Sequence, residues 1–155
     1  MNRRLLLWLK RNAVAIQAAT GILTILFALA ALMGVKMQID AAAQLQREQS
    51  ARDIYREYLN LGIARPEFAR PDYCAIIGTP QEAAYESYVD YMLYTAEQAI
   101  EADPDWVPVF DRNIGQHGAY ICAVSDWQDF GPDTRRLIDR FRNRQCQTVR
   151  RCSDI

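Results

Sequence analysis

The residues best suited to chemistry are one histidine and four cysteines. His117 is the only histidine, and Cys122 follows it five residues later. A cysteine beside a histidine is a common nucleophile, but on a helix five positions separate two side chains by about 140°, so this pair diverges. We therefore expect His117 to be a structural histidine, hydrogen-bonded near the core. An enzyme that uses His117 or Cys122 is the minor alternative.

The cysteines Cys74, Cys122, Cys146 and Cys152 contain no C-x-x-C pair. That spacing argues against a zinc ribbon and against a thioredoxin-type redox centre. Outside the cytoplasm, an even number of cysteines predicts two disulfides, and three pairings are possible. In one of them Cys146–Cys152 closes a short loop in the tail, and Cys74–Cys122 joins the 64–78 loop to the third helix. In the cytoplasm all four would be free thiols.

No other pattern predicts a reaction. The sequence has no glycine-rich phosphate loop, no nucleophile elbow and no H-E-x-x-H. Asp90 and Glu97 lie two helical turns apart, and we expect them to be solvated or bonded to tyrosines rather than to act as an acid/base pair. We therefore expect no catalytic residue, no cofactor and no metal.

An apolar segment near the N-terminus predicts a membrane anchor. Residues 13–35 form a run of 23 residues without a charge. As a helix the run would span roughly 34 Å, which is enough to cross a bilayer core of about 30 Å. A cleavable signal peptide is the alternative, but its apolar region is usually about 7–15 residues long. We expect an uncleaved, single-pass transmembrane helix.

Positive charge gives the expected orientation. Basic residues flank the apolar run, with Arg3, Arg4, Lys10 and Arg11 before it and Lys36, Arg47 and Arg52 after it. The small excess in the 1–12 flank favours a cytoplasmic N-terminus. We expect the C-terminal domain to lie on the opposite side of the membrane from the cytoplasm. Four small residues in the run have small-xxx-small spacing, which lets another membrane helix approach closely: Ala15, Ala19, Ala30 and Gly34.

The rest of the chain predicts helices and no strands. Residues 36–62 are rich in helix formers, so the anchor should continue to about Leu61, with Gly62 as its C-cap. Residues 64–78 contain two prolines and a glycine, which predicts a loop. The capping sequence at 79–82 then starts a helix that should run to about Ala102.

Tyrosines recur every three residues on this helix, at Tyr85, Tyr88, Tyr91 and Tyr94. Such a series drifts around a helix by about 60° per step, so the four rings cover one broad side. We expect this side to pack against the membrane-proximal helix. A surface for a binding partner is the alternative.

Two further helices complete the expected fold. One begins near Asp103 and carries the apolar stripe Phe110, Ile114, His117 and Ile121, and the last runs from 131 to about 144 with Leu137, Ile138 and Phe141 inward. We predict an all-α protein in which one transmembrane helix continues into a long helix with about three shorter helices packed on its extramembrane end. The expected segments are a basic flank (1–12), the anchor (13–35), a helical domain (36–145) and an Arg/Cys-rich tail (146–155).

Charge is segregated along the chain. Residues 1–71 carry a net charge of +5, residues 72–133 carry −11, and residues 134–155 carry +5. We expect the acidic block and the basic tail to neutralise each other. Contact of the tail with anionic lipid or an acidic partner is the alternative. Nucleic acid is not an expected partner, because the acidic block would repel phosphate.

Several short motifs lie between about residues 15 and 142: RDIYREYL at 52–59, PEFA at 66–69, YE at 85–86, YV at 88–89, YML at 91–93, Trp106, His117 and YIC at 120–122. With these motifs the chain resembles a loose group of bacterial proteins that have one N-terminal spanning helix, a small helical domain and no assigned activity. For the orientation given above, the resemblance implies the bacterial inner membrane, with the C-terminal domain in the periplasm. The resemblance implies a recurring fold and brings no catalytic role. The basic N-terminus and the Arg/Cys tail depart from it.

These observations favour a non-catalytic accessory or scaffolding subunit of a larger membrane complex. Its expected partners are the lipid bilayer and other membrane subunits, or a second copy through the spanning helix. The alternative is a membrane-tethered sensor or regulator that binds a small ligand or peptide in a tyrosine-rich groove.

Overall fold

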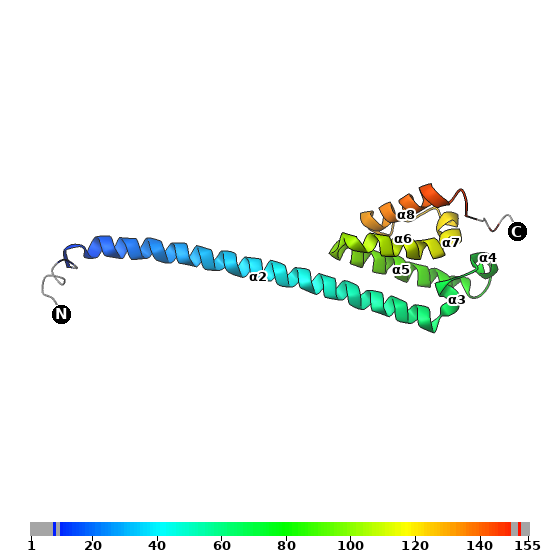
Figure 1. Cartoon of the computed structure of the whole chain (residues 1–155), viewed down its shortest axis with the longest axis horizontal. Helices are drawn as coiled ribbons and strands as arrows, with labels where there is room; N and C mark the ends of the chain where they lie inside the picture. The colour runs from blue at the N-terminus through cyan, green and yellow to red at the C-terminus, as the bar shows by residue number, and fades with distance from the viewer. Residues whose placement is uncertain (1–7, 9, 150–151, 153–155) are drawn as a thin grey trace. The chain divides into compact units, whose positions relative to one another are not determined.

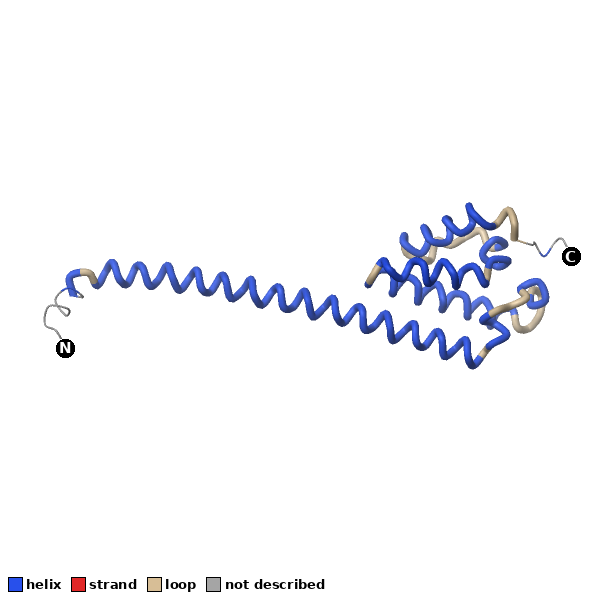
Figure 2. Tube along the Cα trace, in the orientation of Figure 1, coloured by secondary structure: helices blue, strands red, loops and turns tan. Residues whose placement is uncertain are grey.

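The computed structural model describes residue 8, residues 10–149 and residue 152, and every regular element in that part of the chain is helical. The all-α prediction is therefore confirmed, and Figure 2 shows helices joined by loops. The elements in order are α2 (Ala13–Ala64), α3 (Pro66–Ala69), α4 (Tyr73–Ile76), α5 (Glu82–Ala102), the 3-10 helix η1 (Pro104–Trp106), α6 (Val107–Gln116), α7 (Gly118–Ala123) and α8 (Pro132–Gln145) (Figure 1).

The chain divides into two units, Met1–Gln44 and Leu45–Ile155, and α2 contributes to both. In the first unit, α2 carries an apolar segment that no other described residue covers. Leu26 and Phe27, for example, are 57% and 67% exposed. By length and composition α2 is able to cross a membrane, and it is the one described helix with that property.

The end of α2 differs from the prediction. The helix continues to Ala64, so Gly62 lies inside it and is not a C-cap. A Cβ on Gly62 would lie 3.1 Å from the hydroxyl oxygen of Tyr88 and 3.7 Å from Cβ of Ala69. Gly62 is thus a point of close approach, where a larger side chain would push the tyrosine away.

The 64–78 segment is not only a loop. It forms the two short helices α3 and α4, because buried side chains fix both turns: Phe68 is 2% exposed, Tyr73 is 6% exposed and Ile76 is 8% exposed. With these, six α-helices and one 3-10 helix follow α2 in the described residues. The prediction of about three shorter helices was therefore too low.

The capping sequence at 79–82 forms a turn that precedes α5, so the helix begins later than predicted. Thr79 Oγ1 accepts a hydrogen bond from the backbone N–H of Gln81 at 3.2 Å, and Glu82 Oε2 accepts one from the N–H of Gly78 at 2.8 Å. These bonds close a turn, aided by the positive φ of Gly78, and α5 begins only at Glu82. It ends at Ala102, as predicted.

The single helix expected after Asp103 is divided into η1, α6 and α7. His117 follows α6 and precedes α7, with φ −105° and ψ 19°, so the chain bends there. The predicted stripe is buried despite the break: Phe110, Ile114 and Ile121 are fully buried and His117 is 1% exposed. The bend keeps residues from both helices on the core side.

The second unit is built around α5, which lies beside α6 and α8 (Figure 1) and contacts both. Its buried face includes Val89, Met92, Leu93 and Ala96, all 0% exposed. The inward residues predicted on α8 are also buried, with Leu137 at 2%, Ile138 at 0% and Phe141 at 1% exposure.

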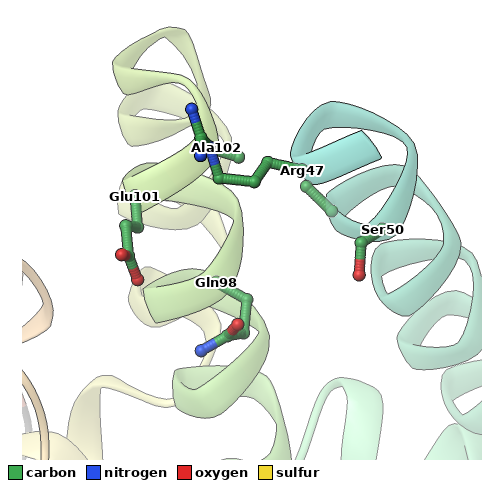
Figure 3. Close-up of a pocket in the computed structure, with 6 residues that line it drawn as sticks. Arg47, Ser50, Gln98, Glu101 and Ala102 are labelled. Atoms are coloured by element: carbon green, nitrogen blue, oxygen red, sulfur yellow. The ribbon is translucent and has the colours of Figure 1, made fainter. Parts of the chain in front are cut away.

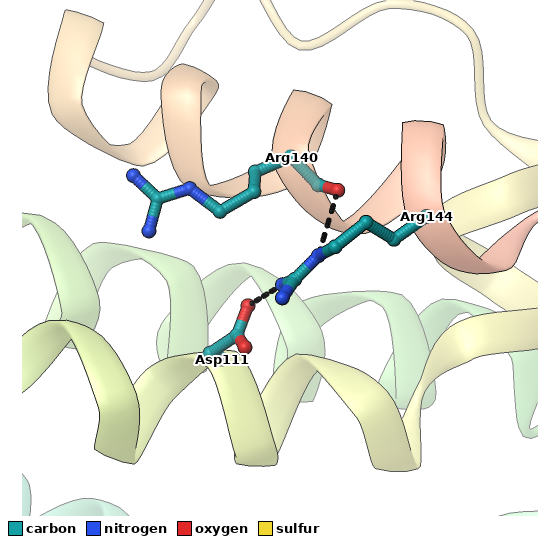
Figure 4. A network of polar contacts seen from close by, with 3 residues as sticks. All are labelled: Asp111, Arg140 and Arg144. Carbon is teal, nitrogen blue, oxygen red and sulfur yellow. Dashed lines mark hydrogen bonds and ion pairs between the residues drawn. The ribbon is translucent and has the colours of Figure 1, made fainter.

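Opposite charges meet between α6 and α8. Arg144 Nη2 lies 2.5 Å from Asp111 Oδ1, and Arg144 Nε donates to the carbonyl oxygen of Arg140 at 3.2 Å (Figure 4). A second pair, Arg136 with Asp133, lies at the start of α8. The acidic block and the basic segment are therefore in contact at Asp111 and Arg144. Most of the 150–155 end of the expected tail lies outside the described residues.

Candidate functional site

The centre of the second unit holds a buried tyrosine–histidine pair. The hydroxyl oxygen of Tyr85 lies 3.0 Å from Nδ1 of His117, and both side chains are buried. The ring of Tyr88 also packs against the histidine, with its centroid 5.8 Å from that of the imidazole. Burial lowers the pKa of His117 from 6.5 to about 4, so the imidazole is neutral at pH 7. His117 thus lies hydrogen-bonded in the core, the environment expected of a structural histidine.

Other rings surround the pair. Tyr85 lies 5.9 Å from Phe68, 5.8 Å from Tyr73 and 5.5 Å from Tyr120, measured between ring centroids. Burial raises the pKa of Tyr85 above its ordinary value, so its hydroxyl keeps its proton. The short helices α3, α4 and α7 are thus attached to α5 through aromatic contacts.

The tyrosines of α5 do not form one surface. Tyr85 is 0% exposed and Tyr88 is 3% exposed, so the alternative of one exposed surface made by all four tyrosines does not hold. Tyr91 is half-buried, and Tyr94 is 49% exposed. The drift of an i+3 series explains this gradient, since each step turns the next ring about 60° away from the core.

The expected packing of these tyrosines against α2 occurs at two positions. The ring of Tyr88 lies 5.7 Å from that of Tyr58 on α2. Tyr91 donates a hydrogen bond from its hydroxyl to Glu57 Oε2 at 3.2 Å. Burial, followed by this bond, raises the pKa of the Tyr91 hydroxyl.

The four cysteines form two disulfides, Cys74–Cys152 and Cys122–Cys146, with Cα–Cα distances of 5.1 and 5.5 Å. The pairing considered above, Cys146 with Cys152 and Cys74 with Cys122, is therefore wrong. The reason is the contact between α7 and α8, which places Cys146, just after α8, against Cys122. Cys122 is thereby bonded and is not a thiolate nucleophile.

A groove opens beside Tyr88 and Tyr91. It has a volume of about 370 Å³ and is mostly apolar. The residues that line it come from the end of α2, from Arg65, from α3 and from α5: Leu61, Arg65, Phe68, Ala84, Ser87, Tyr88 and Tyr91. Its volume lies within the range of small-ligand sites, roughly 300–1,000 Å³.

Polar groups border this groove. Arg65 Nε lies 2.7 Å from Glu67 Oε1, and its guanidinium lies 4.6 Å over the ring of Phe68. Tyr91, whose hydroxyl is bonded to Glu57, is also one of the lining residues. This arrangement suits an apolar side chain or a small apolar ligand that ends in a polar group.

A smaller hollow lies between α2 and α5 near the end of α5 (Figure 3). Its volume is about 130 Å³, and its polar lining includes Arg47, Ser50, Gln98 and Glu101. It is too small for most organic substrates.

Of the residues that line the groove, the sequence predicts only Tyr88 and Tyr91 as candidates for a binding surface. Phe68 lies in the segment predicted as a loop, and Leu61 and Arg65 lie at a helix end that was placed too early. The spacing Pro66-Glu67-Phe68 was the available signal, because proline favours the first turn of a helix. Asp90 is exposed, as expected of a solvated carboxylate. The expectation is wrong for Glu97, whose Oε2 accepts a hydrogen bond from the N–H of Gly131 at 3.0 Å and not from a tyrosine.

Within the described residues, no group of three or more His, Cys, Asp or Glu side chains is placed to hold a metal ion. Neither a protein-family model, a curated protein nor a solved structure matches this chain.

Proposed function

We propose that this protein is a membrane-anchored, non-catalytic accessory subunit of a larger bacterial membrane complex. The observation that carries the proposal is the apolar segment of α2, none of which is buried by other described residues. An uncovered apolar helix in water would be an aggregation hazard, whereas a bilayer accommodates it. The 23-residue run is longer than the apolar region of a usual signal peptide, which favours a retained anchor.

The two disulfides support an extracytoplasmic position for the helical domain. Such bonds persist in oxidising compartments such as the periplasm and are rare in the cytoplasm. The positive flank before the anchor favours the same orientation, with the N-terminus in the cytoplasm.

The residues best suited to chemistry already take part in structural contacts. Cys122 is oxidised, and His117 is buried and bonded to Tyr85. By contrast, Ala15, Ala19 and Ala30 are exposed on α2, and a Cβ on Gly34 would meet nothing within 4 Å. These small residues are suited to close contact with another membrane helix.

Native mass spectrometry of the full chain, released from membranes in mild detergent, tests the proposal. We expect a heteromeric assembly of fixed stoichiometry, which Gly34→Leu weakens because a bulky side chain blocks close helix approach. Gly21→Leu is the matched control, since Gly21 is equally open and lies about 220° around the helix from Gly34. A monomer or a pure homo-oligomer from gentle extraction would overturn the accessory role.

A second candidate function is a membrane-tethered sensor that binds a small ligand or peptide. The apolar groove beside Tyr88 and Tyr91 favours it. Ala84→Phe would fill the groove, while Ala83→Phe adds the same ring one position away, outside the lining. Each variant is expressed in cells from which the gene has been deleted. If the protein is a sensor, Ala83→Phe should restore the response that the deletion removes, and Ala84→Phe should not. Equal responses from both variants would count against this function.

A further inference from the structure

The disulfides of this chain do not join cysteines in the order in which they occur. Cys122–Cys146 lies inside the loop that Cys74–Cys152 closes, with sequence separations of 24 and 78 residues. A consecutive set would instead join Cys74 to Cys122 and Cys146 to Cys152. In a chain without structure, loop closure favours this consecutive set by roughly tenfold, mainly because Cys146 and Cys152 are only six residues apart.

The order of synthesis favours the same wrong set. Domains form from the N-terminal side as the chain is made, at about 5–20 residues per second. Cys74 and Cys122 therefore reach an oxidant before Cys146 is available. With 24 residues still to follow, the delay is about 1–5 seconds.

The fold also brings Cys74 and Cys122 into the same neighbourhood. Cys74 is on α4 and Cys122 is on α7, and these two helices contact each other. The residue before Cys74, Tyr73, packs on Tyr120 with ring centroids 5.3 Å apart. Partial folding of this region therefore promotes the non-native bond before α8 exists.

We propose that this chain depends on a thiol–disulfide isomerase as a folding partner, which converts the consecutive disulfides into the native pairs. The inference rests on the proposed extracytoplasmic position of the domain. Uncatalysed rearrangement takes minutes to hours, much longer than synthesis. All four cysteines are only partly buried, so a catalytic thiol is able to reach them.

The exchange is balanced and needs no net oxidant. The isomerase thiolate attacks the Cys74 sulfur of Cys74–Cys122, which forms a mixed disulfide and releases the Cys122 thiolate. That thiolate attacks Cys146 in Cys146–Cys152, forms the native bond and releases the Cys152 thiolate. Cys152 then attacks Cys74 in the mixed disulfide, which completes the second native bond and returns the isomerase thiolate.

Packing of α8 against α7 stabilises the native disulfide pairs. Phe141 packs at Gly118 of α7, where a Cβ would lie 3.1 Å from the ring. Arg142 Nη1 donates to the carbonyl oxygen of Val124 at 2.9 Å. These contacts hold the end of α8 against α7, so Cys146 stays beside Cys122 once the helix has docked.

The test is disulfide mapping of the full-length, membrane-bound chain from two bacterial strains. One strain has normal thiol oxidation and normal isomerase activity, and the other lacks only the isomerase. Cells are alkylated before lysis, and peptides are identified without reduction. We expect the fraction with Cys74–Cys152 to fall at least threefold in the second strain, with Cys74–Cys122 in its place.

The matched control is the double variant Cys122→Ser and Cys146→Ser. It retains only Cys74 and Cys152, so no wrong intramolecular pair exists and its yield of that bond should be equal in both strains. Equal native pairing of the unmodified chain in both strains would overturn the inference while leaving the proposed function intact. Equal dependence of the double variant would also overturn it, because the isomerase would then act without exchanging pairs. Four free thiols in both strains would instead overturn the extracytoplasmic position, and the inference with it.

Discussion

His117 and Tyr85 form a buried polar contact in a core made mostly of aromatic and aliphatic side chains. Placing a histidine there has a consequence for its charge, because desolvation disfavours the imidazolium form. The 3.0 Å contact with the Tyr85 hydroxyl is the one hydrogen bond described for the imidazole ring, and Nε2 has no described partner. The pair therefore affects both the stability of the domain and its response to pH.

Tyr85→Phe isolates the contribution of that hydrogen bond. The ring is retained, but Nδ1 of His117 loses its partner in a buried site, so we expect a loss of about 1–2 kcal/mol in the free energy of unfolding. Denaturant unfolding in detergent measures the change. Tyr94→Phe removes the same hydroxyl from an exposed ring and should stay within about 0.5 kcal/mol of the unmodified chain. Equal effects of the two changes would contradict a structural role for the bond.

The lowered pKa of His117 predicts a loss of stability in mild acid. Above about pH 6.5 the imidazole is neutral in both the folded and the unfolded chain. Between pH 6.5 and about pH 4 the unfolded chain binds a proton that the folded chain excludes, so acid favours unfolding. We expect the unmodified chain to lose about 2 kcal/mol more than His117→Gln between pH 7 and pH 4.5. Parallel pH profiles for the two chains would show that His117 titrates normally in the fold.

The start of α8 depends on a residue from α5. Glu97 accepts a hydrogen bond from the N–H of Gly131, and a Cβ on Gly131 would lie 2.6 Å from Oε1 of that carboxylate. The glycine lets the carboxylate approach the positive end of the helix dipole. One side chain thus caps a helix 34 residues further along the chain.

Glu97→Ala should therefore destabilise the domain by about 1 kcal/mol, the usual cost of losing a helix cap. Glu97→Gln keeps an acceptor and should lose less. Glu101→Ala is the matched control one turn further on, at an exposed position of the same helix, and should be nearly neutral. Thermal unfolding followed by circular dichroism compares the three, and an equal cost at Glu101 would contradict the capping role.

Helices were predictable from the sequence where one face is buried along several turns. Leu137, Ile138 and Phe141 repeat with a helical period, and all three are buried. Helix ends were less predictable. His117, where the chain bends, is bonded to Tyr85 on another helix, which no local pattern reveals. The late start of α5 follows instead from the local turn that Thr79 and Glu82 close at Gly78.

The candidate groove was predictable only in part, for a similar reason. The spacing of tyrosines on α5 predicts Tyr88 and Tyr91. Phe68 lines the groove because a short helix, α3, begins at Pro66 and ends before Pro71. The disulfide pairing depends on the contact of α7 with α8, which is a property of the assembled fold and not of cysteine spacing.

The proposed membrane anchor gives a prediction about the whole molecule. Leu26 lies in the middle of the apolar run and is exposed on α2. Leu26→Arg should raise the free energy of membrane insertion by about 3 kcal/mol. We expect the variant to be lost from the carbonate-resistant membrane fraction or to be degraded, whereas Leu26→Ala should behave like the unmodified chain. Unchanged retention of the arginine variant would contradict a spanning role for this segment.

The most direct test of the central claim, a single crossing with the helical domain outside the cytoplasm, is site-specific thiol labelling in intact cells. Arg11→Cys and Asn60→Cys each add one exposed thiol, on opposite sides of the apolar run. The described cysteines are all disulfide-bonded, so the unmodified chain gives the background. With a membrane-impermeant maleimide, we predict labelling at residue 60 and not at residue 11 until the inner membrane is permeabilised. Equal labelling of both positions in intact cells, or labelling of residue 11 alone, would contradict the claim.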